Sequence, residues 1–282
     1  MVDMPAPLWD CHVHVFDAKA PIAPGHYTPA HRPLRVIEAL AQANGFGHLV
    51  LVQPSVYGTD NTVLLEALRA SPGRHRGVVV IDQTVSNLAL QDMHALGVRG
   101  VRFNLVSPVT CWGGATQTGR DQGRHRLAAI FGELAPRLQA LGWHVQWYAH
   151  PDDLQTIVSL HARGPAGLVA VLDHLAGLHA GLSLQHPAWL AVARLAASGA
   201  WVKLSGWYRL RAAEPYATLD ETLSRVAALF GERMVWGSDW PHTSFSPGAL
   251  PDYATTWAPV VRVLPAEKKN PVWHHSAALL YA

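Results

Sequence analysis

The chain has 282 residues, of which 49% are hydrophobic and 15% are charged, and its formal net charge is +2. This length suits an α/β barrel, and the nearly balanced charge argues against a nucleic-acid-binding surface. No apolar run is long enough to cross a bilayer and no secretory pattern opens the chain, so we expect a cytoplasmic protein. Two cysteines, Cys11 and Cys111, are too few for a disulfide framework and fit a reducing compartment.

Short apolar runs alternate with segments of helical character along the chain. Eight runs predict buried parallel strands, because they are nearly continuous in valine, leucine and isoleucine; they start near Leu8, His48, Gly77, Gly100, His144, Leu168, Ala200 and Met234. Helices are expected between them, over 34–43, 61–70, 87–96, 125–141, 152–162, 187–198 and 219–230. The alternation predicts an α/β fold, a single (β/α)8 TIM-type barrel domain over residues 1–282, with two C-terminal helices from about residue 251 covering it.

Polar residues collect just past the ends of the predicted strands, where barrel enzymes build their active sites. His12 and His14 stand two positions apart in the first strand, so their imidazoles point to the same side. His174 follows the sixth strand and Asp239 follows the eighth. Imidazole is a metal ligand and a general acid or base near neutral pH, and a carboxylate complements it. These four residues therefore predict a hydrolytic active site.

The same alternation predicts where neighbouring residues point. Cys11 should face away from the two histidines and pack in the barrel wall. Asp173 should face the opposite side of its strand from His174 and serve as a structural or outer hydrogen-bond partner. Four tryptophans flank strand ends and could form an aromatic wall for a flat ring, namely Trp147, Trp207, Trp236 and Trp240.

Seven segments, taken in order, resemble the amidohydrolase superfamily of the amidohydrolase-2 type. They are WDCHVHVFD, VQPSVYGTDN, GVRGVRFN, WHVQWY, VLDHLAG, VKLSGWYRL and VWGSDWPH. The resemblance is strongest to the lactonase branch, which includes 2-pyrone-4,6-dicarboxylate lactonase and galactarolactone isomerase. It implies a TIM-type barrel and hydrolysis or isomerisation of a cyclic ester. Some members of the branch use one divalent metal ion and others use none.

Carried over position by position, the resemblance gives His12, His14, His174 and Asp239 as catalytic residues and, if a zinc-like ion is bound, as its ligands. It gives the substrate contacts as Ser55, Tyr57, Arg102, Tyr148 and Arg209. The chain departs from the pattern in two places. A second arginine that follows the strand-four arginine in the dicarboxylate lactonase is replaced here by SPVTCWGG, although Arg120 and Arg124 come later. The strand-five ligand of many superfamily members has three candidates here, His144, Gln146 and His150.

These positions predict a mechanism for lactone hydrolysis. Asp239, with a pKa raised by a partly dry cleft, takes a proton from the water that attacks the lactone carbonyl. His12, His14 and His174 stabilise the oxyanion directly or through a metal ion. Arg102 and Arg209 grip a substrate carboxylate at two points.

Three other functions stay open from the sequence. A metal-dependent decarboxylase of the same superfamily uses the same histidines and aspartate, and a lactone isomerase differs only in the attacking group. A ligand-binding protein on a retired barrel is the non-enzyme alternative. We expect a small-molecule substrate, no nucleic-acid or membrane partner, and leave a homo-oligomer open.

Overall fold

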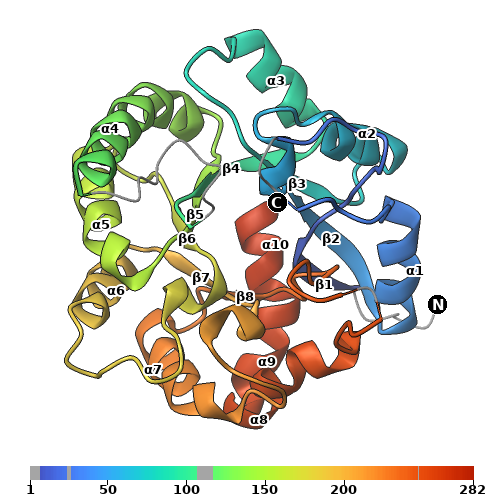
Figure 1. Ribbon diagram of the computed structural model, residues 1–282, viewed down its shortest axis with the longest axis vertical. Helices are drawn as coiled ribbons and strands as arrows, with labels where there is room; N and C mark the ends of the chain where they lie inside the picture. Colours follow the sequence, from blue (N-terminus) through green and yellow to red (C-terminus); the bar gives the residue numbers. More distant parts are fainter. Residues whose placement is uncertain (1–6, 24–26, 107–116, 247) are drawn as a thin grey trace.

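The computed structural model describes residues 7–23, 27–106, 117–246 and 248–282. Eight parallel strands form one sheet in the order β1 to β8 (Figure 1). They are β1 (Leu8–Val13), β2 (Phe46–Val52), β3 (Arg76–Val79), β4 (Val98–Asn104), β5 (His144–Tyr148), β6 (Ala170–Leu172), β7 (Trp201–Leu204) and β8 (Met234–Trp236). The segment after β8 returns to β1, where Asp239 N donates to His12 O at 2.9 Å and His14 N donates to Trp240 O at 2.9 Å. The predicted (β/α)8 barrel is confirmed.

Helices surround the barrel and bury their apolar faces against the outside of the sheet (Figure 1). The seven predicted between strands are present: α1 (Leu34–Ala43), α2 (Thr62–Ala70), α3 (Asn87–Ala95), α4 (Gln117–Ala140), α5 (Leu154–Arg163), α6 (Ala188–Ala197) and α7 (Asp220–Phe230). α4 begins well before the predicted start at 125. Within the described ranges, no helix is long and apolar enough to cross a membrane.

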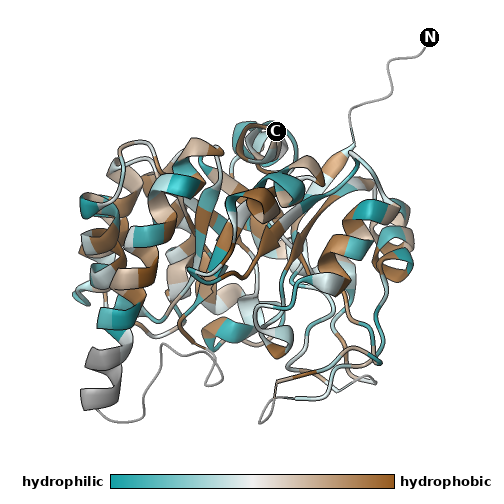
Figure 2. Ribbon diagram, turned by 90° about the horizontal axis from the view of Figure 1, so that it is seen from above, coloured by the Kyte–Doolittle hydropathy of each residue, from teal (hydrophilic) through white to brown (hydrophobic). Residues whose placement is uncertain are grey.

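The C-terminal segment closes one end of the barrel. Where two helices were expected, there are three, α8 (Ala258–Val263), α9 (Ala266–Trp273) and α10 (His275–Tyr281). α10 lies across the amino ends of the strands, at the top in Figure 2. Arg76 Nε at the start of β3 donates to Tyr281 O, and Arg99 Nε in β4 donates to Ala282 O, both at 2.8 Å. A site for a substrate must therefore lie at the opposite end of the barrel, at the carboxyl ends of the strands.

A register shift in β1 changes which residues face the barrel interior. Asp10 pairs with Leu49 and Val13 with Leu51, so β1 uses three steps where β2 uses two. This is a β-bulge, which breaks the alternation of side chains. Cys11 consequently packs inside the barrel, in an inner cluster made of Trp9, Cys11, Val50, Val52, Val78, Val235, Ala277 and Tyr281. The expectation that Cys11 faces away from the histidines was wrong.

The tryptophans at the strand ends do not form an aromatic wall in the described structure. All four are buried in the core between the sheet and the helices, with Trp147 and Trp236 at 0% exposure. The indole nitrogens of Trp207 and Trp236 both donate to Thr256 O, at 2.6 and 3.0 Å. These side chains anchor the C-terminal segment to the barrel.

Candidate active site

His12 in β1 and His14 directly after it aim the same ring nitrogen at one carboxylate oxygen. His14 Nδ1 lies 2.7 Å from Val52 O. A carbonyl oxygen only accepts, so Nδ1 carries the hydrogen and the lone pair lies on Nε2. His14 Nε2 is 3.5 Å and His12 Nε2 is 3.6 Å from Asp239 Oδ1. Burial lowers the pKa of both histidines, which favours neutral rings.

Asp239 is fully buried, and its two oxygens have different surroundings. Oδ2 accepts hydrogen bonds from Arg209 Nε and Tyr208 OH, each at 2.6 Å. Oδ1 has no hydrogen-bond partner among the residues that the structure describes. Burial raises the pKa of Asp239, but Arg209 and His174 lower it, and the net pKa lies well below its ordinary value. The expected raised pKa was wrong, because the sequence does not show Arg209 beside the carboxylate.

His174 reaches the site through a left-handed turn directly after β6. Its φ is 48°, and Leu175 and Ala176 follow with φ of 49° and 57°. Nδ1 lies 2.9 Å from Ser205 Oγ, and the ring centre is 4.9 Å from that of His12. Burial lowers its pKa to about 4. Gly206 makes room for the ring, since a Cβ at that position would clash with Nδ1. His174 is therefore held as a neutral group beside His12.

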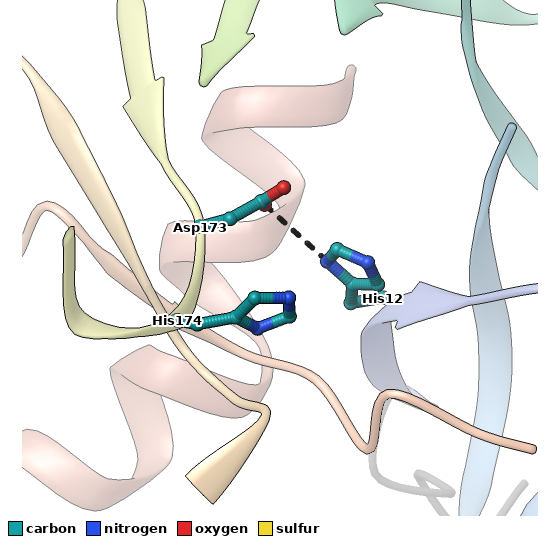
Figure 3. A group of neighbouring side chains, drawn as sticks. All are labelled: His12, Asp173 and His174. Carbon is teal, nitrogen blue, oxygen red and sulfur yellow. Dashed lines mark ion pairs between the residues drawn. The ribbon is translucent and has the colours of Figure 1, made fainter. Parts of the chain in front are cut away.

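Asp173 also points into the barrel, contrary to the expectation that it faces away from His174. The positive φ of His174 ends the strand alternation, so both side chains reach the interior (Figure 3). Asp173 Oδ1 lies 3.4 Å from His12 Nδ1, and Oδ2 accepts from Arg102 Nε at 3.0 Å and Gln146 Nε2 at 3.1 Å. The sequence signal that could have found it is the adjacent pair Asp-His at the end of a strand.

A cavity of about 230 Å³ opens beside His14. Four of the five expected substrate contacts line it, namely Ser55, Arg102, Tyr148 and Arg209. The guanidinium carbons of Arg102 and Arg209 lie 5.1 and 6.0 Å from the centre of the Tyr148 ring. Two cations and one aromatic ring therefore face the same space, an arrangement that can bind an anionic group.

The fifth expected contact, Tyr57, does not line this cavity in the described structure. Its hydroxyl donates to Asp17 O at 3.0 Å and accepts from Asp17 N at 3.1 Å, which ties two loops together. Tyr27 lines the cavity instead and forms a hydrogen bond with Thr243. Tyr27 was missed because it lies in a loop without periodicity.

The buried donor atoms fit a divalent metal ion. Ligand atoms of His12, His14 and Asp239 all lie within 4.8 Å of one another, and a second such group contains His12, Asp173 and His174. His12 Nε2, His174 Nε2 and Asp239 Oδ1 lack hydrogen-bond partners within the described ranges. Imidazole nitrogens with one carboxylate oxygen are a donor set that suits zinc.

None of the three strand-five candidates joins this donor set within the described structure. Gln146 Nε2 is hydrogen-bonded to Asp173, His144 packs against the Tyr281 ring at the other end of the barrel, and His150 is exposed. Arg124 lies 3.8 Å from Asp153 in an ion pair, so it does not take the place of the second arginine. Cys111 and the Arg120 side chain lie outside the described residues.

A barrel that gathers histidines and an aspartate at the carboxyl ends of β1, β6 and β8 is the framework of a barrel hydrolase. The family model described as Amidohydrolase matches residues 9–282, and the chain belongs to this enzyme family.

Relatives of known name agree. The chain is 30% identical over 279 residues to the 2-pyrone-4,6-dicarboxylate hydrolase of Comamonas testosteroni, a match that covers 92% of this chain and 87% of that one. It is 29% identical over 259 residues to the 4-sulfomuconolactone hydrolase of Rhizobium radiobacter, covering 88% and 81%. A crystal structure from Pseudomonas putida, provisionally described as a 2-pyrone-4,6-dicarboxylic acid hydrolase, has a TM-score of 0.80 and 32% identity, covering 98% and 97%.

Proposed function

We propose that the protein hydrolyses a small lactone that carries a carboxylate. The observation that carries this proposal is the position of Asp239 Oδ1, a buried carboxylate oxygen without a hydrogen-bond partner in the described structure. Arg102 and Arg209 line the cavity beside it. The two hydrolases named above act on a carboxylated pyrone and on a lactone, which supports the same class of substrate.

Asp239 is the general base of the proposed reaction. Arg209 and Tyr208 occupy Oδ2, so Oδ1 is the oxygen that accepts a proton from water as the water oxygen bonds to the lactone carbonyl carbon. The ring C–O bond then breaks, and the proton passes from Asp239 to the leaving oxygen. Because Asp239 has a low pKa, it is ionised and ready to accept at neutral pH.

The three histidines differ in what they can do for the developing oxyanion. His14 presents a lone pair at Nε2, since its hydrogen is on Nδ1. The Ser205 hydroxyl can donate to His174 Nδ1, which leaves a hydrogen on His174 Nε2 for the oxyanion. A zinc-like ion held by His12, His14 and Asp239, with His174 beside them, would polarise the lactone carbonyl.

The cavity also indicates how the substrate is held. A carboxylate between the Arg102 and Arg209 guanidinium groups would place the flat lactone ring against Tyr148. The Ser55 and Tyr27 side chains complete the walls. A cytoplasmic location and one domain over 1–282 remain our predictions, and a homo-oligomer is left open.

The substitution Asp239→Asn tests the proposal. We expect it to slow turnover of carboxylated lactones by roughly a hundredfold to ten-thousandfold, the usual contribution of a general base. The matched control is Asp220→Asn, which removes a carboxylate paired with Arg262 on the surface and should leave turnover unchanged. Release of acid, followed with a pH indicator with and without a chelator, separates hydrolysis from isomerisation and shows metal dependence. An unchanged rate in Asp239→Asn refutes the assignment.

A further inference from the structure

Asp173 connects four strands at the base of the site. It follows β6, and its partners come from β1, β4, β5 and β7. Oδ2 accepts from Arg102 Nε and Gln146 Nε2, while Oδ1 lies 3.4 Å from His12 Nδ1 and 4.0 Å from Lys203 Nζ. Its side chain is 0% exposed. A carboxylate buried this deeply is costly unless it is paired, so this arrangement requires all of its cationic neighbours.

The contact with His12 decides which ring nitrogen of His12 faces the substrate. An ionised carboxylate, which only accepts, faces each ring nitrogen of His12, and the contact with Asp173 is the shorter one at 3.4 Å, which favours the hydrogen of a neutral His12 ring on Nδ1, toward Asp173 (Figure 3). The lone pair is then on Nε2, which faces Asp239 Oδ1 at 3.6 Å. A carboxylate behind a histidine is the arrangement that orients metal-binding or proton-accepting imidazoles in other proteins.

The second oxygen of Asp173 acts on substrate binding. Arg102 Nε is hydrogen-bonded to Oδ2, and the same arginine lines the cavity. Its guanidinium is thereby fixed over the Tyr148 ring. One carboxylate outside the cavity lining therefore controls both a histidine of the reacting centre and an arginine of the binding site.

The carboxylate of Asp173 also compensates the positive charge of Lys203, which is buried in the barrel. Its ammonium group is fully buried, donates to Cys11 O at 2.8 Å and lies 5.8 Å from the centre of the Tyr281 ring. Asp173 is the one carboxylate within ion-pair distance of it in the described part of the chain. A metal ion on Asp173 would add positive charge beside Lys203 and Arg102, which disfavours a metal ion at the group of His12, Asp173 and His174.

We propose that Asp173 is a positioning residue, which fixes His12 with Nδ1 protonated and holds Arg102 against the cavity. The proposal rests on the proposed function for the role of the cavity, but the orientation of His12 can be measured without a substrate. The first measurement uses the wild-type protein labelled with ¹⁵N-histidine, and a His12→Asn spectrum assigns the His12 signals. We expect the hydrogen on Nδ1. A hydrogen on Nε2 overturns the proposal without any variant of Asp173.

The second measurement uses Asp173→Asn and the charge-compensated double variant Asp173→Asn/Lys203→Met. The double variant removes one negative and one positive charge, so it keeps the test available where Asp173→Asn alone does not fold. In the folded variant we expect a mixture of His12 tautomers and a ten- to hundredfold loss of zinc affinity in calorimetry. KM for carboxylated lactones should rise as well, because Arg102 loses its anchor.

The matched control is Gln146→Met, which removes one donor to Asp173 Oδ2 but leaves the His12 contact. It should keep the wild-type His12 tautomer and zinc affinity. A merely structural role for Asp173 predicts a lower melting temperature with unchanged tautomer and zinc affinity, and that result overturns the proposal. Absence of lactone turnover in the wild type would instead refute the proposed function, while the His12 tautomer would still decide the role of Asp173.

Discussion

Replacement of Arg209 by methionine should make the base of the reaction visible in the pH profile. Arg209 Nε donates to Asp239 Oδ2 at 2.6 Å, and the carboxylate is fully buried. Burial raises the pKa of Asp239, and Arg209 is the strongest influence that lowers it. Without the guanidinium, burial is opposed by the nearby histidines and by the Tyr208 hydroxyl, which donates to Oδ2. The pKa of Asp239 should therefore rise in Arg209→Met.

The size of the effect follows from the contact. A guanidinium next to a carboxylate lowers its pKa by roughly 1–3 units, and each unit corresponds to about 1.4 kcal/mol. We expect the acidic limb of kcat/KM to move to higher pH by about the same 1–3 units, because this limb reports the base of the free enzyme. Methionine keeps an apolar chain over the Tyr208 ring, where the guanidinium carbon lies 4.9 Å from the ring centre.

The assay is kcat/KM for a carboxylated lactone, measured from acidic to alkaline pH. Arg262→Met is the control, because Arg262 also pairs with a carboxylate, Asp220, at 2.6 and 2.8 Å, but on the surface. It should leave the profile unchanged. KM should rise in Arg209→Met but not in Arg262→Met, since Arg209 lines the cavity. An acidic limb that superimposes on the wild type would show that Arg209 does not set the pKa of Asp239.

Two further predictions concern glycine packing and buried histidines. Gly206→Ala should displace His174 and lower turnover at least tenfold, because the added methyl clashes with Nδ1 and φ is 58°; wild-type kinetics would contradict the packing argument. Burial lowers the pKa of four histidines to about 3 or 4, His144, His161, His174 and His242. In the unfolded chain these histidines have a pKa of about 6.5, so below that pH they bind protons that the folded protein does not bind. The free energy of unfolding should therefore fall as the pH drops from about 6.5 to 4, by about 1.4 kcal/mol per pH unit for each histidine. Burial raises the pKa of Asp10 to about 6, so protonation of Asp10 stabilises the folded protein over the same pH range and offsets the effect of one histidine. A melting temperature that is constant over this range would refute the prediction.

The barrel could be predicted from the sequence because its strands are continuous apolar runs. The predicted strand starts differ from the observed ones by no more than two residues, as at Leu168, where β6 begins at Ala170. Alternation within β5 also determines which way Trp147 faces. Gln146 and Tyr148 share one face, so Trp147 between them must face the helices. The burial of Trp147 was therefore predictable, and its place in an aromatic wall was not supported.

The parts of the site that could not be predicted depend on backbone irregularities and contacts between distant segments. Cys11 points inward because of a bulge in β1, which no local residue pattern announces. Tyr27 lines the cavity from a loop, and Arg209 approaches Asp239 from the loop after β7. Propensity and periodicity describe a strand or helix by itself, so they carry no information on contacts between residues that are far apart in the sequence.

Backbone conformation gives independent support for the location of the site. The described chain has seven non-glycine residues with positive φ, and five of them lie in the segments after β6 and β8: His174, Leu175, Ala176, Asp239 and His242. This conformation costs roughly 1–2 kcal/mol for a residue with a side chain. Such residues persist where surrounding structure enforces them, and they concentrate at functional sites. The turns with positive φ are the ones that direct His174 and Asp239 toward His12. The fold is therefore less stable than it could be at the positions where the proposed reaction requires these side chains to lie close together.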